Sequence, residues 1–228
     1  SIFTPITQKK SAMKKYLKTD EWNIIEDSFQ ADRMRWSESI FSLGNGRFGQ
    51  RGYFEEPYSS DSYRGAFVAG ITFLDKTRVG WWKNGFPQFY TRIPNAPDWS
   101  SISLRLIDEE LDLAQWDVDS FNRRLDMKAG ISYRDVEVTS PRGNKLRLHV
   151  EHIADMARPN LCLIKYSVTS LNYAGKVSLV PTFDGDIAQH TEHPDEKIWN
   201  ILRSGTTSDC AYLWTQLSLI HISEPTRP

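Results

Sequence analysis

The sequence predicts an all-β domain, an antiparallel β-sandwich of the large type called a super-sandwich, with few short helices. From Trp22 onward, short β-rich runs alternate with Gly, Pro, Asn and Asp, and no segment has the long 3.6-residue apolar period of a helix. The clearest run, residues 145–150, places Leu146, Leu148 and Val150 on one side and charged or polar residues on the other. This alternation indicates a sheet with one buried face.

The second half of the chain repeats this pattern. Strands are predicted over residues 121–127, 131–138, 145–150, 161–168 and 177–183. Short turns join them, so they predict an antiparallel meander that closes as a sandwich or a barrel. The apolar alternation shifts between Tyr133 and Val136 and again near Leu163. We interpret each shift as a β-bulge or as a strand that changes its exposed face.

The first half is less regular. Strands are predicted over residues 37–43, 47–54, 64–74 and 101–107. The last two are separated by a predicted loop, residues 75–99, which carries Trp81, Trp82 and several other aromatic and proline residues. A long loop with this aromatic content is more often functional than a bare connector.

Composition excludes several function classes. The 228 residues suffice for one large all-β unit or two small domains, and 28 Lys and Arg nearly cancel 29 Asp and Glu. A net charge of -1 gives no electrostatic reason to bind nucleic acid or an anionic membrane. Neither a membrane span nor a secretory signal is visible. Cys162 and Cys210 are predicted to be buried thiols in a reducing compartment, so we expect a soluble, cytoplasmic protein.

Several motifs have a structural interpretation beside a functional one. Residues 44–49 satisfy G-x-G-x-x-G, but a phosphate loop needs a following helix, and a strand is predicted there. The acidic runs 55–56 and 108–110, with Asp112, could supply glycosidase carboxylates, yet adjacent acids in turns are normally solvated, so both are predicted surface loops. His190 and His193 lie near Asp184, Asp186 and Glu192 without a standard zinc spacing, so no metal is expected.

Longer blocks carry a family resemblance. Residues 21–29 match W-x-I-x-E-x-x-F, and residues 38–46, 49–52 and 54–56 match E-S-x-F-x-L-G-N-G-x-x-G-x-R-G-x-x-E-E. Further blocks follow in order at residues 67–70, 95–99, 110–113 and 123–127. Over residues 21–203 the chain resembles the amino-terminal domain of glycoside hydrolase family 65, which includes maltose, kojibiose and trehalose phosphorylases.

The resemblance implies an inverting enzyme with an amino-terminal β-sandwich, a helical linker, an (α/α) barrel and a small carboxy-terminal β-domain. Such enzymes cleave α-linked disaccharides such as maltose, trehalose, kojibiose or nigerose, mostly with inorganic phosphate as the attacking group and in a few members with water. One Glu in the barrel acts as general acid. The resemblance therefore implies no catalytic residue in this chain, no cofactor, and a homodimer.

The same comparison sets the expected boundaries. Residues 1–20 are a lead-in, and Met13 would be a natural start, so the residues before it are expected to be upstream sequence or a tag. Residues 21–216 are the expected sandwich domain, itself incomplete. Residues 217–228 resemble translated sequencing-adapter DNA and are expected to be a non-native tail on a truncated gene.

Alternatives remain open for the site and for the function. Trp81 and Trp82 are the candidate substrate-loop residues, because a flat ring can cover the C–H face of a sugar. The alternative is that both rings pack against the sandwich edge or the barrel. A free-standing carbohydrate-binding sandwich, or a purely structural domain, competes with the enzyme fragment.

Overall fold

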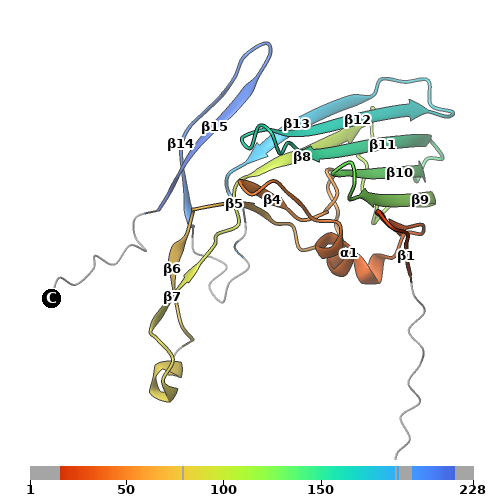
Figure 1. The fold of residues 1–228 in the computed structure, drawn as a ribbon. Helices are drawn as coiled ribbons and strands as arrows, with labels where there is room; N and C mark the ends of the chain where they lie inside the picture. The colour runs from red at the N-terminus through yellow and green to blue at the C-terminus, as the bar shows by residue number, and fades with distance from the viewer. Residues whose placement is uncertain (1–15, 79, 188, 190–196, 219–228) are drawn as a thin grey trace, which may run out of the picture.

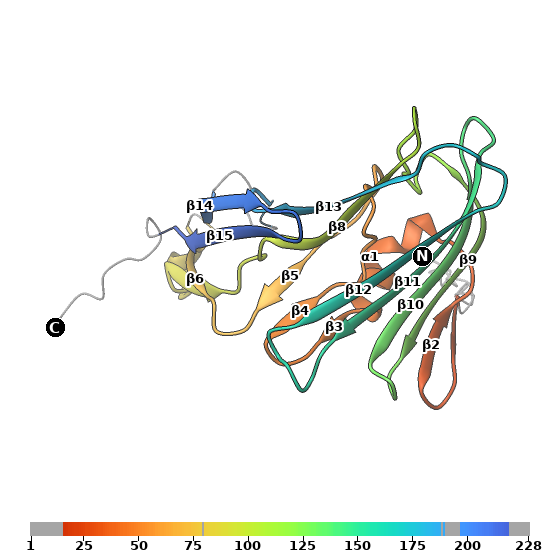
Figure 2. The same ribbon diagram turned by 90° about the horizontal axis from the view of Figure 1, so that it is seen from above.

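The structure is a computed structural model that describes residues 16–78, 80–187, 189 and 197–218. Its main feature is a curved antiparallel sheet of six strands in the order β1-β2-β9-β10-β11-β12 (Figures 1 and 2). The strands of this sheet are β1 (Leu17–Thr19), β2 (Asn23–Glu26), β9 (Asp117–Asp126), β10 (Ile131–Thr139), β11 (Lys145–Ala154) and β12 (Cys162–Ser170). Strands dominate the described residues, which confirms the all-β prediction.

Smaller sheets and short helices make up the rest. β8 pairs with β13, β3 with β4 and β5, β6 with β7, and β14 with β15. Their bounds are β3 (Leu43–Gly44), β4 (Phe48–Gln50), β5 (Ala66–Val68), β6 (Phe73–Lys76), β7 (Phe89–Arg92), β8 (Asp98–Arg105), β13 (Ser178–Asp184), β14 (Trp199–Thr206) and β15 (Ala211–Leu217). The described helices are η1 (Ala31–Arg33), α1 (Met34–Ile40) and η2 (Trp81–Asn84).

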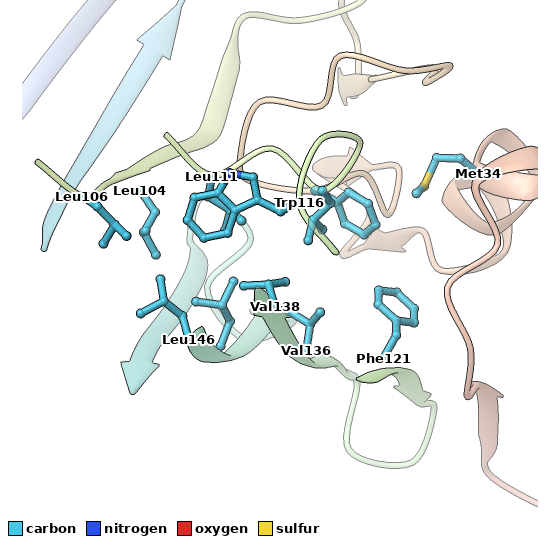
Figure 3. Packing of buried hydrophobic residues seen from close by; sticks show 12 residues of the cluster. Met34, Leu104, Leu106, Leu111, Trp116, Phe121, Val136, Val138 and Leu146 are labelled. Carbon is cyan, nitrogen blue, oxygen red and sulfur yellow. The ribbon is translucent and has the colours of Figure 1, made fainter. Parts of the chain in front are cut away.

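The core lies between the six-stranded sheet and the layer that contains β8. Leu104 and Leu106 face Val138 and Leu146 across this layer (Figure 3). Leu146, Leu148 and Val150 are buried, so the alternation predicted for residues 145–150 is confirmed. Each such side chain contributes about 1.5–3 kcal/mol on full burial, which makes this interface the main source of stability.

The predicted meander is correct for four strands, β9 to β12, and wrong for the fifth. β13 leaves the large sheet and pairs with β8, so it belongs to the second layer of the sandwich. β12 is therefore the last strand of its sheet. Apolar alternation could not distinguish these outcomes, because a strand buries one face in either sheet.

The two predicted irregularities in the large sheet are absent from their predicted places. In β10 the inward positions are Arg134, Val136 and Val138, and Tyr133 lies on the opposite face. Alternation is thus unbroken, and the apparent shift arose because an arginine occupies an inward position. β11 and β12 also pair without a shift. The bulge lies instead where β9 pairs with Glu137 and Val138.

The predicted strand over residues 37–43 is wrong, because residues 34–40 form α1. The helix buries Met34, Ser37 and Glu38, an i, i+3, i+4 spacing that is hidden in the sequence because two of these residues are polar. Ser37 donates a hydrogen bond to Glu26 at 2.8 Å. Glu38 accepts one from the backbone N–H of Tyr63 at 2.7 Å, so both polar side chains are satisfied inside the fold.

Candidate functional site

The glycine-rich turn serves the fold and not a phosphate. Residue Asn45 accepts hydrogen bonds from the backbone N–H groups of Arg47 and Phe48 at 3.0 and 2.8 Å. Its amide also donates to the carbonyl of Asp155 at 3.0 Å, which ties the turn to the end of β11. Strand β4 follows directly. The predicted turn role is confirmed, because no helix N-terminus is present to hold an anion.

The acidic pair at residues 55–56 contradicts its prediction as a solvated surface loop. Glu55 and Glu56 are buried, and Glu56 is 0% exposed. The guanidinium of Arg134 donates to Glu56 at 2.7 and 2.9 Å and also to Glu55. The pair is therefore a buried ion cluster, which is stable only because the positive charge lies between the two carboxylates.

Two further groups complete this cluster, which we call the Arg134 cluster (Glu55, Glu56, Arg134, His152 and Tyr166). His152 is hydrogen-bonded to Glu55, and the Tyr166 hydroxyl donates to Glu56. Burial alone would raise the pKa of Glu55, but the charges of Arg134 and His152 outweigh it and hold that pKa well below its usual range. Burial and the Glu56 charge raise the pKa of Tyr166. The cluster connects β10, β11 and β12 to the 54–56 segment.

A proton-transfer role does not suit this cluster. A general acid needs a carboxyl group that keeps its proton near neutral pH. The lowered pKa of Glu55 keeps it ionised, and Glu56 receives two hydrogen bonds from the guanidinium. The Arg134 cluster is a structural element that holds strands together.

The predicted loop over residues 75–99 contains a hairpin. β6 and β7 pair from Phe73 with Arg92 to Lys76 with Phe89, and the hairpin projects from the body of the sandwich (Figure 1). Asp75 accepts hydrogen bonds from Arg92 at 3.0 Å and from Tyr90 at 3.2 Å. These contacts fix the hairpin stem, so the tip is held on a defined arm.

The tip carries the two candidate tryptophans. Trp81 and Trp82 begin the 3₁₀ helix η2, and Gly80 and Gly85 flank it with φ of +87° and +88°. This left-handed conformation favours glycine, so it limits the helix to one short turn. The Trp81 and Phe86 rings lie 5.5 Å apart. Trp81 is 41% exposed and Trp82 38%, so neither ring is buried against the sandwich.

The other predicted site residues are dispersed. Asp108 and Glu110 are exposed as predicted, and Glu109 accepts hydrogen bonds from Ser140 and Asn144 at 2.9 and 2.7 Å. Asp186 pairs with Lys197 at 3.1 Å. His190, Glu192 and His193 lie outside the described residues. Within the residues that the structure describes, no group of acidic, His or Cys side chains could hold a metal ion.

The cysteines depart from their prediction as buried thiols. Cys162 is half-buried in β12, and Cys210 is exposed in the turn between β14 and β15. The turn is polar, and no second layer among the described residues packs over it to bury the thiol. Separately, no helix among the described residues is long and apolar enough to cross a membrane.

The fold defines the class of domain: an all-β sandwich from which an aromatic hairpin projects. The chain belongs to glycosyl hydrolase family 65, because the profile of the family's N-terminal domain matches residues 24–222. The resemblance carried by the sequence blocks is thus confirmed.

Three similar proteins place the chain within that family. It is 38% identical to the maltose phosphorylase of Bacillus subtilis (strain 168), over 85% of this chain and 26% of that protein. It is 32% identical to the kojibiose phosphorylase of Halothermothrix orenii, over 78% of this chain and 22% of that protein. A solved human-microbiome structure with a provisional assignment as kojibiose phosphorylase superposes with a TM-score of 0.78 at 25% identity, covering 89% of this chain and 26% of that one. The chain therefore spans about a quarter of the length of these relatives.

Proposed function

We propose that this chain is the amino-terminal domain of a cytoplasmic, homodimeric, inverting glycoside phosphorylase that acts on an α-linked glucose disaccharide. The observation that carries the proposal is the family match over residues 24–222. Relatives named maltose, trehalose and kojibiose phosphorylase support the substrate class. Inorganic phosphate is the proposed co-substrate.

In this proposal the catalytic groups belong to a part of the enzyme that this sequence does not contain. The chain spans about a quarter of its relatives, and the buried acidic pair Glu55 and Glu56 is locked in ion pairs with Arg134. The general-acid Glu and the phosphate-binding residues would lie in a helical barrel. The domain by itself would then support the barrel and would not catalyse.

The aromatic hairpin is the proposed contribution of this domain to substrate binding. Trp81 and Trp82 sit at the tip of a stem fixed by Asp75 and Arg92, and both rings present open surface. An exposed aromatic face held on a rigid arm suits stacking against a sugar ring. We propose that the tip reaches the mouth of the barrel and contacts the acceptor sugar.

Catalysis by the complete enzyme is the direct test. The enzyme is assayed with maltose, trehalose, kojibiose and nigerose, with and without phosphate, and glucose 1-phosphate and glucose are quantified. Release of β-glucose 1-phosphate that depends on phosphate supports the proposal, whereas equal glucose release without phosphate indicates hydrolysis. Turnover by the isolated 228-residue chain would contradict the inactive-domain part.

The hairpin role is tested separately in the same enzyme. Trp81→Ala and Trp82→Ala should raise KM for the disaccharide about fivefold, because each loses a stacking contact of about 1 kcal/mol. Trp22→Ala is the matched control, since Trp22 is similarly exposed but lies in the turn before β2. Unchanged KM in both hairpin variants would remove the sugar-facing role.

A further inference from the structure

A second feature of this domain is a groove of about 500 Å³ at the end of the sandwich near η1. Its walls come from three segments, residues 27–31, the loop at residues 58–60, and residues 113–121 at the start of β9. Small-molecule sites in proteins typically have volumes of about 300–1,000 Å³. The groove is therefore large enough for a ligand of the size of one or two sugar rings.

Two aromatic rings form its apolar walls. Phe29 and Tyr58 line the groove and are packed edge to face with their centroids 6.4 Å apart. The ring centroids of Phe29 and Phe121 are 5.6 Å apart. Trp116 and Phe121 also line the groove and belong to the core cluster drawn in Figure 3. Both wall rings are thus anchored by the core and keep part of their surface open. Such rings can cover the C–H face of a pyranose with little loss of conformational entropy.

The rim of the groove is acidic. It includes the carboxylates of Asp27, Asp117 and Asp119, together with serine hydroxyls, and no Lys, Arg or His is among the described residues that line the groove. Lys18 pairs with Asp27, and the Thr139 hydroxyl donates to Asp119, so one oxygen of each carboxylate is engaged from outside the groove. Lys145 also lies 3.7 Å from Asp119, so lysines partly neutralise the rim. Its remaining acceptor oxygens suit ligands that donate several hydrogen bonds.

The β-bulge in β9 places these carboxylates. Val118 pairs with Val138 and Ser120 pairs with Glu137, which leaves Asp119 as the extra residue. A bulge re-aims the side chains beside it. As a result, the consecutive residues Asp119 and Ser120 are both exposed at the groove, where a regular strand would expose alternate residues.

We propose that this groove binds one pyranose ring of a neutral saccharide, with the open ring face of the Phe29–Tyr58 pair against its C–H face and with Asp117 and Asp119 accepting from its hydroxyl groups. The choice of an α-linked glucoside as the saccharide rests on the proposed function. An organic cation is less suitable, because aromatic cages surround a cation with open ring faces. Trp116 is buried here, so only two rings offer open surface.

The test is isothermal titration calorimetry of the 228-residue chain with maltose. Glucose 1-phosphate and choline serve as the anionic and cationic probes. Asp117→Asn should weaken maltose binding about tenfold, because a hydrogen bond to a charged group contributes roughly 1.5–3 kcal/mol. Asp209→Asn, an exposed aspartate in the β14–β15 turn, is the matched control and should leave binding unchanged.

A second pair of variants tests the aromatic wall. Tyr58→Leu should abolish measurable maltose binding, and Tyr212→Leu, which alters an exposed tyrosine on β15, should not. Circular dichroism shows whether Tyr58→Leu folds. If this variant does not fold, the calorimetry of Asp117→Asn decides the test. Absence of maltose binding, tighter binding of choline or glucose 1-phosphate, or equal loss in the control variants would overturn the proposal.

These outcomes are independent of catalysis. If the complete enzyme cleaves disaccharides and the isolated chain binds none, the proposed binding to the groove is wrong and the proposed function is still supported. If the groove binds a saccharide and the complete protein cleaves no α-glucoside, the groove proposal is supported and the proposed function is wrong.

Discussion

Replacement of Arg134 by methionine removes the positive charge that the Arg134 cluster needs. The residue is 5% exposed, and its side chain donates to two carboxylates that are themselves buried. Methionine keeps the apolar stem but leaves Glu55 and Glu56 facing each other without their cation. Removing one partner of a buried ion pair typically costs about 3–5 kcal/mol. Whole domains are stable by only about 5–15 kcal/mol, so this single change should consume much of the stability.

The measurement is urea unfolding of the chain, followed by circular dichroism and tryptophan fluorescence. Arg134→Met should lower the free energy of unfolding by about 3–5 kcal/mol. The triple variant Arg134→Met, Glu55→Gln, Glu56→Gln should recover a large part of the loss, since no buried charge then lacks a partner. If Arg134→Met alone lies within about 1 kcal/mol of the wild type, near the average effect of any point mutation, the cluster does not support the fold as argued.

Three further predictions test other features. Gly52→Ala should destabilise the chain by about 1–3 kcal/mol by overpacking, because a Cβ there would lie 2.8 Å from the Phe41 carbonyl oxygen. In the control Gly49→Ala the added Cβ meets nothing within 4 Å, so this variant should be nearly neutral in the same urea series. The pKa of Glu55 is lower in the folded state than the usual value of 4.5, so near and below pH 4.5 the unfolded chain binds more protons than the folded one. Stability should therefore fall as the pH drops from about 5 to about 3. Glu55→Gln should make this fall smaller, and Glu110→Gln is the exposed control. Cys210 should react with a thiol reagent before Cys162, whose partial burial raises the thiol pKa, and Cys210→Ser should remove the fast phase in a stopped-flow trace.

Sequence predicts a strand most clearly where every inward position is apolar. Leu146, Leu148 and Val150 predict a strand because every second residue is aliphatic. The same reasoning failed at α1, where Ser37 and Glu38 are buried. In β10 it predicted the strand but also a shift that is absent, because Arg134 occupies an inward position. Burial of these residues depends on partners that are distant in the chain, and local periodicity contains no information about such partners.

The candidate sites divide in the same way. Sequence reasoning located the aromatic hairpin, since a dense run of aromatic residues is visible without any fold. It missed the groove at Phe29 and Tyr58, because its walls come from three segments that only the folded chain brings together. It also wrongly predicted that Glu55 and Glu56 are solvated. The available signal was Arg134, which shares the inward face of its strand with Val136 and Val138 and so needs a buried counter-charge.

The Arg134 cluster also restricts how the large sheet can assemble. In the native alignment Arg134 lies opposite Arg123 on β9 and Val150 on β11. A slip of β10 by one residue would reverse every side chain on that strand. The guanidinium would then reach solvent, while Glu55 and Glu56 would remain inside with no counter-charge, a state that is far less stable than a misaligned strand of aliphatic residues. One buried cation thereby makes a slipped alignment of β10 much less stable than the native one.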